Sequence, residues 1–281
     1  MELSIIKIGG NIIDDETKLG AFLDAFAAVK GKKILVHGGG KLATKLADGL
    51  GIRQQLVDGR RITDAETLRI VTMVYAGTIN KNIVAQLQAR GCNALGLTGA
   101  DGNAILAHKR GVAGAPGGGN AALGSEAPGS GGATPAIDYG YVGDVDAVNA
   151  PFLTSLLEQD KVLVFAPITH DGKGQLLNTN ADTIAQEIAR GLSGSFETSL
   201  VYSFEKSGVL LHAEDESSVI GRIDPSYYQE LKQRQVIFAG MIPKLDNAFA
   251  ALRSGVGKVI IGRAEELPQL LAGQSGTTIV Q

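Results

Sequence analysis

The order of apolar and amphipathic segments is the feature that most constrains this chain. Short apolar runs recur along it: "LSIIKI", "KILVH", "NALGL", "KVLVFAPI", "SLVYSF" and "KVIIG". Stretches with helical periodicity, at 21–30, 42–50 and 181–192, lie between several of them. Such alternation is typical of a mostly parallel β-sheet covered by helices on both faces. The sequence therefore predicts an α/β fold, in which ligands bind at the carboxyl ends of the strands.

Length, charge and cysteine content narrow the classes of partner. A chain of 281 residues is near the upper size for one hydrophobic core, so we expect a single domain over 1–281 with two lobes. Its 26 Lys+Arg and 29 Asp+Glu give a net charge of −3, which argues against nucleic-acid binding. Cys92 stands alone, and the start "MELSIIKIGG" lacks the features of a signal peptide. We expect a cytoplasmic protein with small ligands and no membrane partner.

Residues 63–66, "TDAE", form a capping box that predicts the start of a long helix at this point. One face of that helix is apolar over Ile70, Val71, Val74, Tyr75, Ile79, Ile83, Val84 and Leu87. The stripe favours core packing, with a symmetric dimer interface as the alternative. The segment 111–135 is rich in Gly, Ala, Ser and Pro, and predicts a flexible loop.

The stretch "VHGGGKL" at 36–42 places three glycines between a predicted strand and a predicted helix. Such a turn can serve an esterase oxyanion hole or a phosphate site. The esterase needs G-x-S-x-G, but the closest stretches, "GLSGS" and "GQSGT", lack the last glycine. Neither a P-loop nor H-E-x-x-H occurs, and His108, His170 and His212 lack ligand spacing. We therefore expect a phosphate site and no protein-held metal.

A second glycine turn follows the first apolar run. In "IIKIGG", Lys7 precedes Gly9 and Gly10, while "LVHGGG" ends with Gly38, Gly39 and Gly40. If the two strands are neighbours in a parallel sheet, two banks of N–H groups face each other with a lysine between them. Phosphoryl transfer requires such positive groups. The alternative for Lys7 is a strand-end side chain that reaches water.

Three further motifs carry polar residues. In "DGRRITD", either Arg60 or Arg61 can clamp a carboxylate. In "LLNTNADTIA", Asn178, Asn180 and Asp182 precede a predicted helix, where one of them serves as the N-cap. In "AGMIPKLDNA", Lys244 lies at the start of a helix predicted near Leu245, where its charge can meet a phosphate.

With these residues in place, the chain resembles the amino acid kinase family nearly end to end. The resemblance rests on "IKIGG", "VHGGG", "DGRRIT", "NTNAD" and "GMIPKLDNA" in this order. It implies a three-layer α/β/α sandwich, with an N-lobe at about 1–175 for an acylated amino acid and for dimerisation, and a C-lobe at about 176–281 for ATP. The implied reaction is transfer of the γ-phosphoryl group of ATP, which carries Mg²⁺, to the side-chain carboxylate of an N-acyl-L-glutamate in arginine biosynthesis.

The same resemblance assigns roles to individual residues. It implies that Lys7 and Lys244 stabilise the transition state and that Asp182 orients them. Further residues implied to bind ligands are Gly9, Gly10 and Gly38 for phosphate, Gly39, Gly40, Arg61 and Asn178 for the substrate, and Glu205, Ser207, Gly208 and Val209 for the nucleotide. The nucleotide stretch, "FEKSGV", departs from the Thr-Asp-Val-x-Gly-Val pattern common in relatives.

Several alternatives stay open at this stage. The acyl group can be acetyl or succinyl, and other substrates of the family, such as carbamate or glutamate, use the same chemistry. A metabolite-binding protein without catalysis is a further alternative. Because Lys7 lies close to the start of the sequence, with no room for the extra N-terminal helix of hexameric, arginine-inhibited relatives, the resemblance implies a homodimer without arginine feedback.

Overall fold

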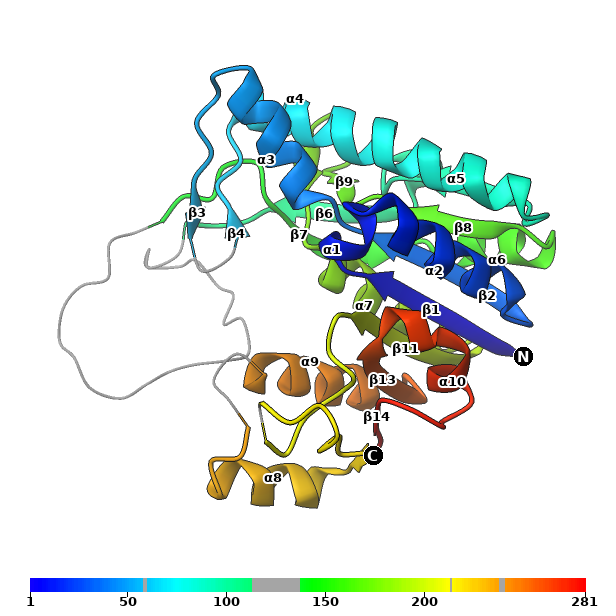
Figure 1. The fold of residues 1–281 in the computed structure, drawn as a ribbon. Coiled ribbons are helices and arrows are strands. Elements are labelled where there is room, and N and C mark those ends of the chain that lie inside the picture. Colours follow the sequence, from blue (N-terminus) through cyan, green and yellow to red (C-terminus); the bar gives the residue numbers. More distant parts are fainter. Residues whose placement is uncertain (58–59, 113–136, 213, 238–240) are drawn as a thin grey trace, which may run out of the picture.

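A central eight-stranded sheet organises the molecule (Figure 1). The computed structural model describes residues 1–57, 60–112, 137–212, 214–237 and 241–281. In spatial order the strands are β12 (Arg222–Ile223), β14 (Thr277–Ile279), β13 (Lys258–Arg263), β11 (Glu197–Phe204), β1 (Glu2–Ile8), β2 (Lys32–His37), β8 (Val162–Phe165) and β5 (Ala94–Leu97). All neighbours pair in parallel except β13 and β14. The predicted mostly parallel sheet is confirmed.

Two smaller sheets are formed by strands between residues 56 and 178. One has the order β10 (Leu176–Asn178), β9 (Ile168–His170), β6 (Ile105–Lys109) and β7 (Gly143–Val148). The other is a hairpin of β3 (Leu56–Val57) and β4 (Arg60–Arg61). The predicted glycine-rich loop at 111–135 lies outside the described residues from 113 onward.

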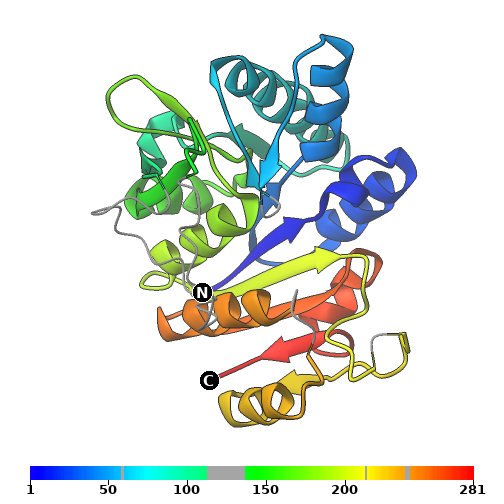
Figure 2. The same cartoon turned by 90° about the vertical axis from the view of Figure 1, so that its left-hand side faces the viewer.

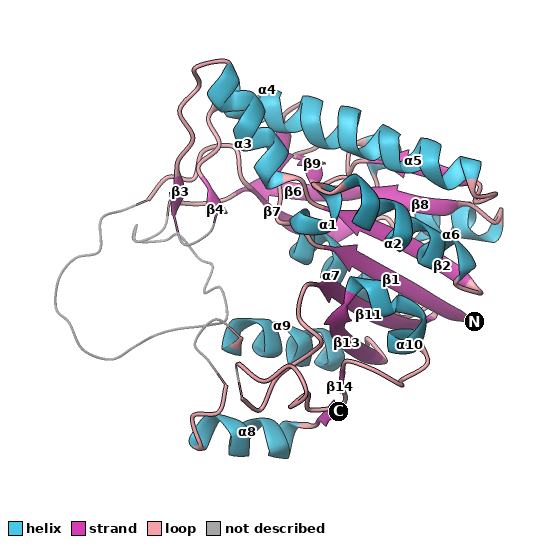
Figure 3. Ribbon diagram, viewed as in Figure 1, coloured by secondary structure: helices cyan, strands magenta, loops and turns pink. Residues whose placement is uncertain are grey.

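Helices cover both faces of the central sheet, as Figures 2 and 3 show. One face packs against α1 (Gly10–Ile13), α2 (Glu16–Ala28), α3 (Gly40–Gly49), α4 (Ala65–Thr72), α5 (Asn80–Ala89) and α10 (Leu267–Leu271). The other packs against α6 (Ala150–Glu158), α7 (Ala181–Leu192), α8 (Pro225–Gln233) and α9 (Ile242–Arg253). Two short 3₁₀ turns, Asp101–Asn103 and Ala264–Glu266, complete the helical segments. These layers confirm the predicted α/β/α sandwich.

The two central strands are apolar because both of their faces are covered. In β1, Ile5 packs into the core below one face, whereas Ile6 and Ile8 pack into the core below the other. Successive side chains of a strand point to opposite faces, so Lys7 points to the same face as Ile5. That face is the one covered by α7. The sequence of β1 therefore directs one lysine toward the start of α7.

Two predicted helix starts need correction. The N-cap of α4 is Asp64, whose side chain accepts the N–H of Thr67 at 2.8 Å, and not Thr63 of the predicted capping box. Thr63 is fully buried and its N–H is bonded to the carbonyl oxygen of Tyr139, so it belongs to the preceding bridge. The last helix of the site begins at Ile242 rather than near Leu245. Proline is tolerated in a first helical turn, which allows this earlier start.

The predicted long apolar helix is interrupted. A π-helical segment, Met73–Ile79, joins α4 to α5. Its wider turn carries Tyr75 and Ile79, both buried, toward the glycine turn after β2. The predicted stripe is buried in the core except at Val84, which is half-buried. Within the described part of the chain, no helix is long and apolar enough to cross a membrane.

Candidate active site

The larger of two adjoining cavities has a volume of about 550 Å³ and lies at the carboxyl ends of β1 and β11. Its charged lining consists of Lys7, Lys41, Lys206, Lys244, Asp182 and Glu205. Apolar side chains, including Ile12, Met241 and Ile261, form part of the wall. A cavity with four lysines and two carboxylates attracts a polyanion, and its apolar wall suits a flat ring system.

The smaller cavity has a volume of about 220 Å³ and shares Gly40 with the larger one. Three arginines line it, Arg60, Arg61 and Arg110, and no acidic side chain does so among the described residues. Gly38, Gly39 and Asn178 also face it. This cavity therefore suits a small anion that approaches the larger cavity at Gly40.

The two glycine turns lie side by side, as predicted from their sequences. β1 pairs in parallel with β2, and Ile8 lies opposite His37 in the register. Gly9 and Gly10 consequently follow one strand where Gly38, Gly39 and Gly40 follow its neighbour. Helix α3 begins at Gly40, so its first N–H groups lie at the junction of the cavities. A helix N-terminus is a favourable place for an anion.

Gly39 is the glycine that geometry requires. Its φ of +146° lies in a region that other residues rarely adopt. A Cβ there would overlap Ile79 Cδ1 and would lie 3.2 Å from Tyr75 Cδ1. At Gly38 a Cβ would meet nothing within 4 Å. The close packing of the π-helical segment against the turn is the physical reason for a glycine at 39.

Lys7, Asp182 and Lys244 are brought together in the larger cavity. Lys7 Nζ lies 2.7 Å from Asp182 Oδ1, and the side chain of Lys7 is only 19 % exposed. Asn180 is the N-cap of α7, accepting the N–H groups of Asp182 at 2.7 Å and Thr183 at 3.2 Å. The cap fixes the first turn, and thereby the carboxylate of Asp182. Lys244 reaches the same cavity from the first turn of α9.

Arg61 is anchored more firmly than Arg60. Its guanidinium donates to the carbonyl oxygen of Gly40 at 2.9 Å, to Thr44 Oγ1 at 2.8 Å and to the side chain of Gln54. Arg60 is exposed. Asn178 donates to Thr63 Oγ1 at 3.1 Å, which fixes its amide at the rim of the smaller cavity. Both arginines face this cavity, but only Arg61 is held against the glycine turn.

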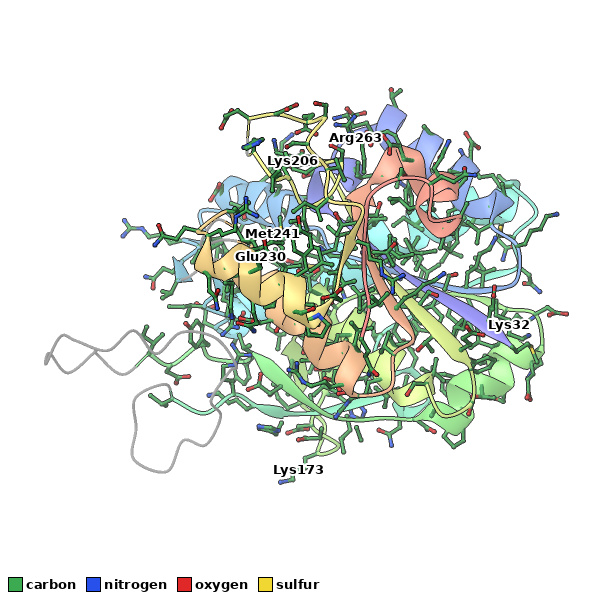
Figure 4. All side chains as sticks on the ribbon, turned by 90° about the horizontal axis from the view of Figure 1, so that it is seen from below. Lys32, Lys173, Lys206, Glu230, Met241 and Arg263 are labelled. Atoms are coloured by element: carbon green, nitrogen blue, oxygen red, sulfur yellow. The ribbon has the colours of Figure 1, made fainter. Side chains whose placement is uncertain are left out.

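The predicted nucleotide residues separate into two groups. Glu205 lines the larger cavity, whereas Ser207, Gly208 and Val209 do not. Ser207 Oγ contacts Glu216, which Lys206 and Arg263 also pair with at 2.9 Å each; Figure 4 shows these two cations near each other. The hydrogen bonds from Ser207 and Lys206 lower the pKa of Glu216 to about 2. Val209 is buried, and its N–H donates to Thr277 Oγ1 at 2.8 Å.

Several lining residues were not predicted from the sequence. Lys41 follows the glycines directly, and its position one residue into α3 could have indicated it. Lys206 and Asn247 reach the larger cavity from segments distant in the sequence. In the smaller cavity, Tyr75 and Arg110 were missed. The charge at the end of β6 was the signal for Arg110, which pairs with Asp144.

A parallel α/β/α fold with opposed glycine turns and with lysines that share one cavity at the strand ends has the positive groups that phosphoryl transfer requires. A model of the amino acid kinase family matches residues 2–263. This chain belongs to the amino acid kinase family.

Known relatives match over nearly their full length. The acetylglutamate kinase of Cytophaga hutchinsonii is 55 % identical over 270 residues, which covers 96 % of this chain and 94 % of the relative. That of Phocaeicola vulgatus is 50 % identical, and the match covers 99 % of this chain and 98 % of the relative.

A solved N-acetylglutamate synthase from Neisseria gonorrhoeae, complexed with coenzyme A and N-acetyl-glutamate, superposes with a TM-score of 0.76. It is 20 % identical, and the match covers 99 % of this chain and 59 % of the synthase, which shows likeness of fold alone.

Proposed function

We propose that this chain is an N-acetyl-L-glutamate 5-phosphotransferase, which moves the γ-phosphoryl group of ATP to the side-chain carboxylate of N-acetyl-L-glutamate in arginine biosynthesis. The observation that carries the proposal is the convergence of Lys7, Asp182 and Lys244 in one cavity that meets a second, arginine-lined cavity at Gly40. The names of the relatives at 50 to 55 % identity support this substrate pair.

The ligands divide between the cavities by size and charge. ATP fits the larger cavity, where Lys7, Lys41 and Lys244 can neutralise its phosphates and the apolar wall can hold adenine. N-acetylglutamate fits the smaller one, with its α-carboxylate on Arg61 and a polar group on Asn178. Its side-chain carboxylate then points toward Gly40, where the cavities join. In this proposed arrangement the acceptor oxygen and the γ-phosphorus would meet at the junction.

The electrostatic problem of the reaction is the approach of two anions. In a site of low dielectric constant their repulsion is worth several kcal/mol unless cations and N–H dipoles offset it. Lys7 faces the larger cavity from the sheet, and Lys244 faces it from α9. The carboxylate of Asp182 forms an ion pair with Lys7 and so fixes the direction of its ammonium. A general base is unnecessary because the attacking carboxylate is already ionised at neutral pH.

Mg²⁺ enters this scheme bound to the phosphates of ATP. Asp182 and Glu205 are the carboxylates that line the larger cavity, and Asp182 is already paired with Lys7. In the described ranges no group of three or more His, Cys, Asp or Glu lies close enough to hold a metal ion. A metal coordinated mainly by phosphate oxygens and water fits these residues. When bound, it would neutralise charge on the phosphates.

We extend the proposal to the lobes and the assembly. Residues 1–175 would bind the acylated amino acid and form a homodimer. Residues 176–281 would bind most of the nucleotide, with Glu205 among the residues that face it. The dependence on ATP is the reason to place the reaction in the cytoplasm. Light scattering at micromolar concentration tests the dimer, and a mass of one chain would contradict it.

Turnover with a set of acceptors tests the proposed function. ADP release is followed with N-acetylglutamate, N-succinylglutamate, glutamate and carbamate, and hydroxylamine traps any acyl phosphate. We expect the highest kcat/KM and a trapped hydroxamate with N-acetylglutamate. A preference for another acceptor would reassign the substrate, and the absence of ADP release with all four would favour a binding protein.

A further inference from the structure

A buried polar network lies directly behind the glycine turn, and the mechanism above does not use it. His37, the last residue of β2, is completely buried. Its Nδ1 lies 2.8 Å from the carbonyl oxygen of Gly38, and its Nε2 lies 3.2 Å from Asn80 Nδ2. Asn80 is 1 % exposed. Two buried polar side chains among apolar neighbours cost stability unless every polar atom is bonded.

The partners of Asn80 determine how its amide is oriented. Lys81 Nζ, which can only donate, lies 3.0 Å from Asn80 Oδ1, so this atom is the acceptor. Asn80 Nδ2 donates to the carbonyl oxygen of Val164 at 2.9 Å and faces His37 Nε2. A nitrogen that faces a donor must accept. His37 Nε2 therefore carries no proton, and the proton of the neutral ring lies on Nδ1.

The proton on Nδ1 determines how the peptide bond between Gly38 and Gly39 is oriented. With its proton on Nδ1, the ring donates to the carbonyl oxygen of Gly38. In a trans peptide the C=O of one residue and the N–H of the next point in opposite directions. A Gly38 carbonyl held toward the buried ring thus directs the N–H of Gly39 away from it, to the side of the smaller cavity that Gly38, Gly39 and Gly40 line.

The neighbouring carbonyls are also occupied. The oxygen of Gly39 accepts from the N–H of Ala43 at 3.1 Å, and that of Gly40 accepts from Arg61 and Thr44. Within the described residues, the N–H groups of Gly39 and Gly40 have no protein acceptor. Since buried backbone N–H groups are nearly always bonded, these two are available to a ligand.

We propose that His37 is a positioning residue for phosphoryl transfer: oriented by Asn80, it holds the Gly38 carbonyl and thereby aims the Gly39 N–H at the anion where the cavities meet. The proposal rests on the proposed function. Burial lowers the pKa of His37 to about 4, with Lys81 adding to the effect, so the ring stays neutral at physiological pH. Among the described residues, the charged group that acts on the His37 ring is Lys81 on α5.

Substitutions of similar shape separate positioning from packing. His37→Asn keeps a donor near the place of Nδ1, whereas His37→Leu has nearly the same outline without a donor. Loss of one aimed N–H typically lowers kcat by ~100-fold. We expect that loss in His37→Leu, with both KM values changed less than ~3-fold, and at least ~10-fold recovery in His37→Asn. His108→Leu, at a half-exposed position outside both cavities, is the control and should leave kcat unchanged.

A spectroscopic measurement tests the proposal without relying on variants that fold. In the unmodified protein with ¹⁵N-labelled histidine, NMR distinguishes a ring protonated at Nδ1 from one protonated at Nε2. We expect the Nδ1–H form for His37, whose ring signals are assigned in the unmodified protein through their connection to the backbone signals of the same residue. The Nε2–H form would overturn the proposal, as would equal kcat in the Leu and Asn variants. Turnover of the unmodified protein is measured first, so that a failure of the proposed function is recognised separately.

Discussion

Gly39→Ala is the substitution whose cost the structure defines best. The new methyl group would overlap Ile79 Cδ1, and the backbone would have to keep a φ of +146° with a side chain attached. An overpacked core costs ~1–3 kcal/mol, and an unfavourable positive φ costs ~1–2 kcal/mol. We expect Gly39→Ala to lower the free energy of unfolding by about 3 kcal/mol. Gly38→Ala is the matched control, since a Cβ there would meet nothing within 4 Å, and it should change stability by less than ~1 kcal/mol.

A double-mutant cycle tests the assigned cause. Ile79→Val removes Cδ1, the atom that a Cβ at 39 would overlap, and alone costs about 1 kcal/mol. If the overlap dominates, the double variant Gly39→Ala/Ile79→Val should be ~2 kcal/mol more stable than the sum of the single changes predicts. The free energy of unfolding of all four proteins is measured by urea titration at pH 7. Additivity within ~0.5 kcal/mol would refute the packing argument and leave backbone strain as the cause.

Three further substitutions or conditions probe other parts of the account. Arg61→Ala should raise the KM for N-acetylglutamate by ~10-fold or more and leave the KM for ATP nearly unchanged; steady-state kinetics showing the opposite split would reassign Arg61. Because the pKa of His37 in the folded protein is lowered to about 4, protonation of this ring favours the unfolded chain. The free energy of unfolding is therefore retained above pH 6.5 and decreases as the pH falls toward 4. Between pH 7 and pH 5 this amounts to ~2 kcal/mol, which urea titrations should show and which His37→Asn should reduce. Lys33→Met should destabilise the protein by ~2 kcal/mol, because Lys33 Nζ bonds three carbonyl oxygens at the end of α2 at 2.8 to 2.9 Å; an unchanged urea midpoint would contradict this role.

The residues predicted best lie at the ends of strands or in the first turns of helices. Lys7 precedes a glycine turn, and Asp182 follows an N-cap. The local sequence therefore predicts which secondary-structure element each residue belongs to and where in that element it lies. Parallel strands bring such ends to one edge of the sheet, and the resemblance carried by the ordered motifs implied that Lys7, Asp182 and Lys244 act together; the three do line one cavity. The layers followed from the same alternation of segments.

What could not be predicted depends on contacts between distant segments. The π-helical segment at Met73–Ile79 has the same apolar spacing as an ordinary helix, so periodicity did not reveal it. Nothing local indicates that Val209 turns into the core, since its N–H bonds to Thr277, which lies far along the chain. Lys206 faces the larger cavity from the loop that follows β11. Tertiary structure decides each of these positions.

The most direct test of the central claim is the turnover number after removal of one cavity ammonium at a time. With ATP and N-acetylglutamate, Lys7→Met and Lys244→Met should each lower kcat by ~1,000-fold, about 4 kcal/mol of lost transition-state stabilisation, with KM values changed only a few-fold. Lys45→Met, at an exposed lysine outside both cavities, should match the unmodified protein. If kcat survives the loss of Lys7 or Lys244, the positive charges that line the larger cavity do not drive the reaction.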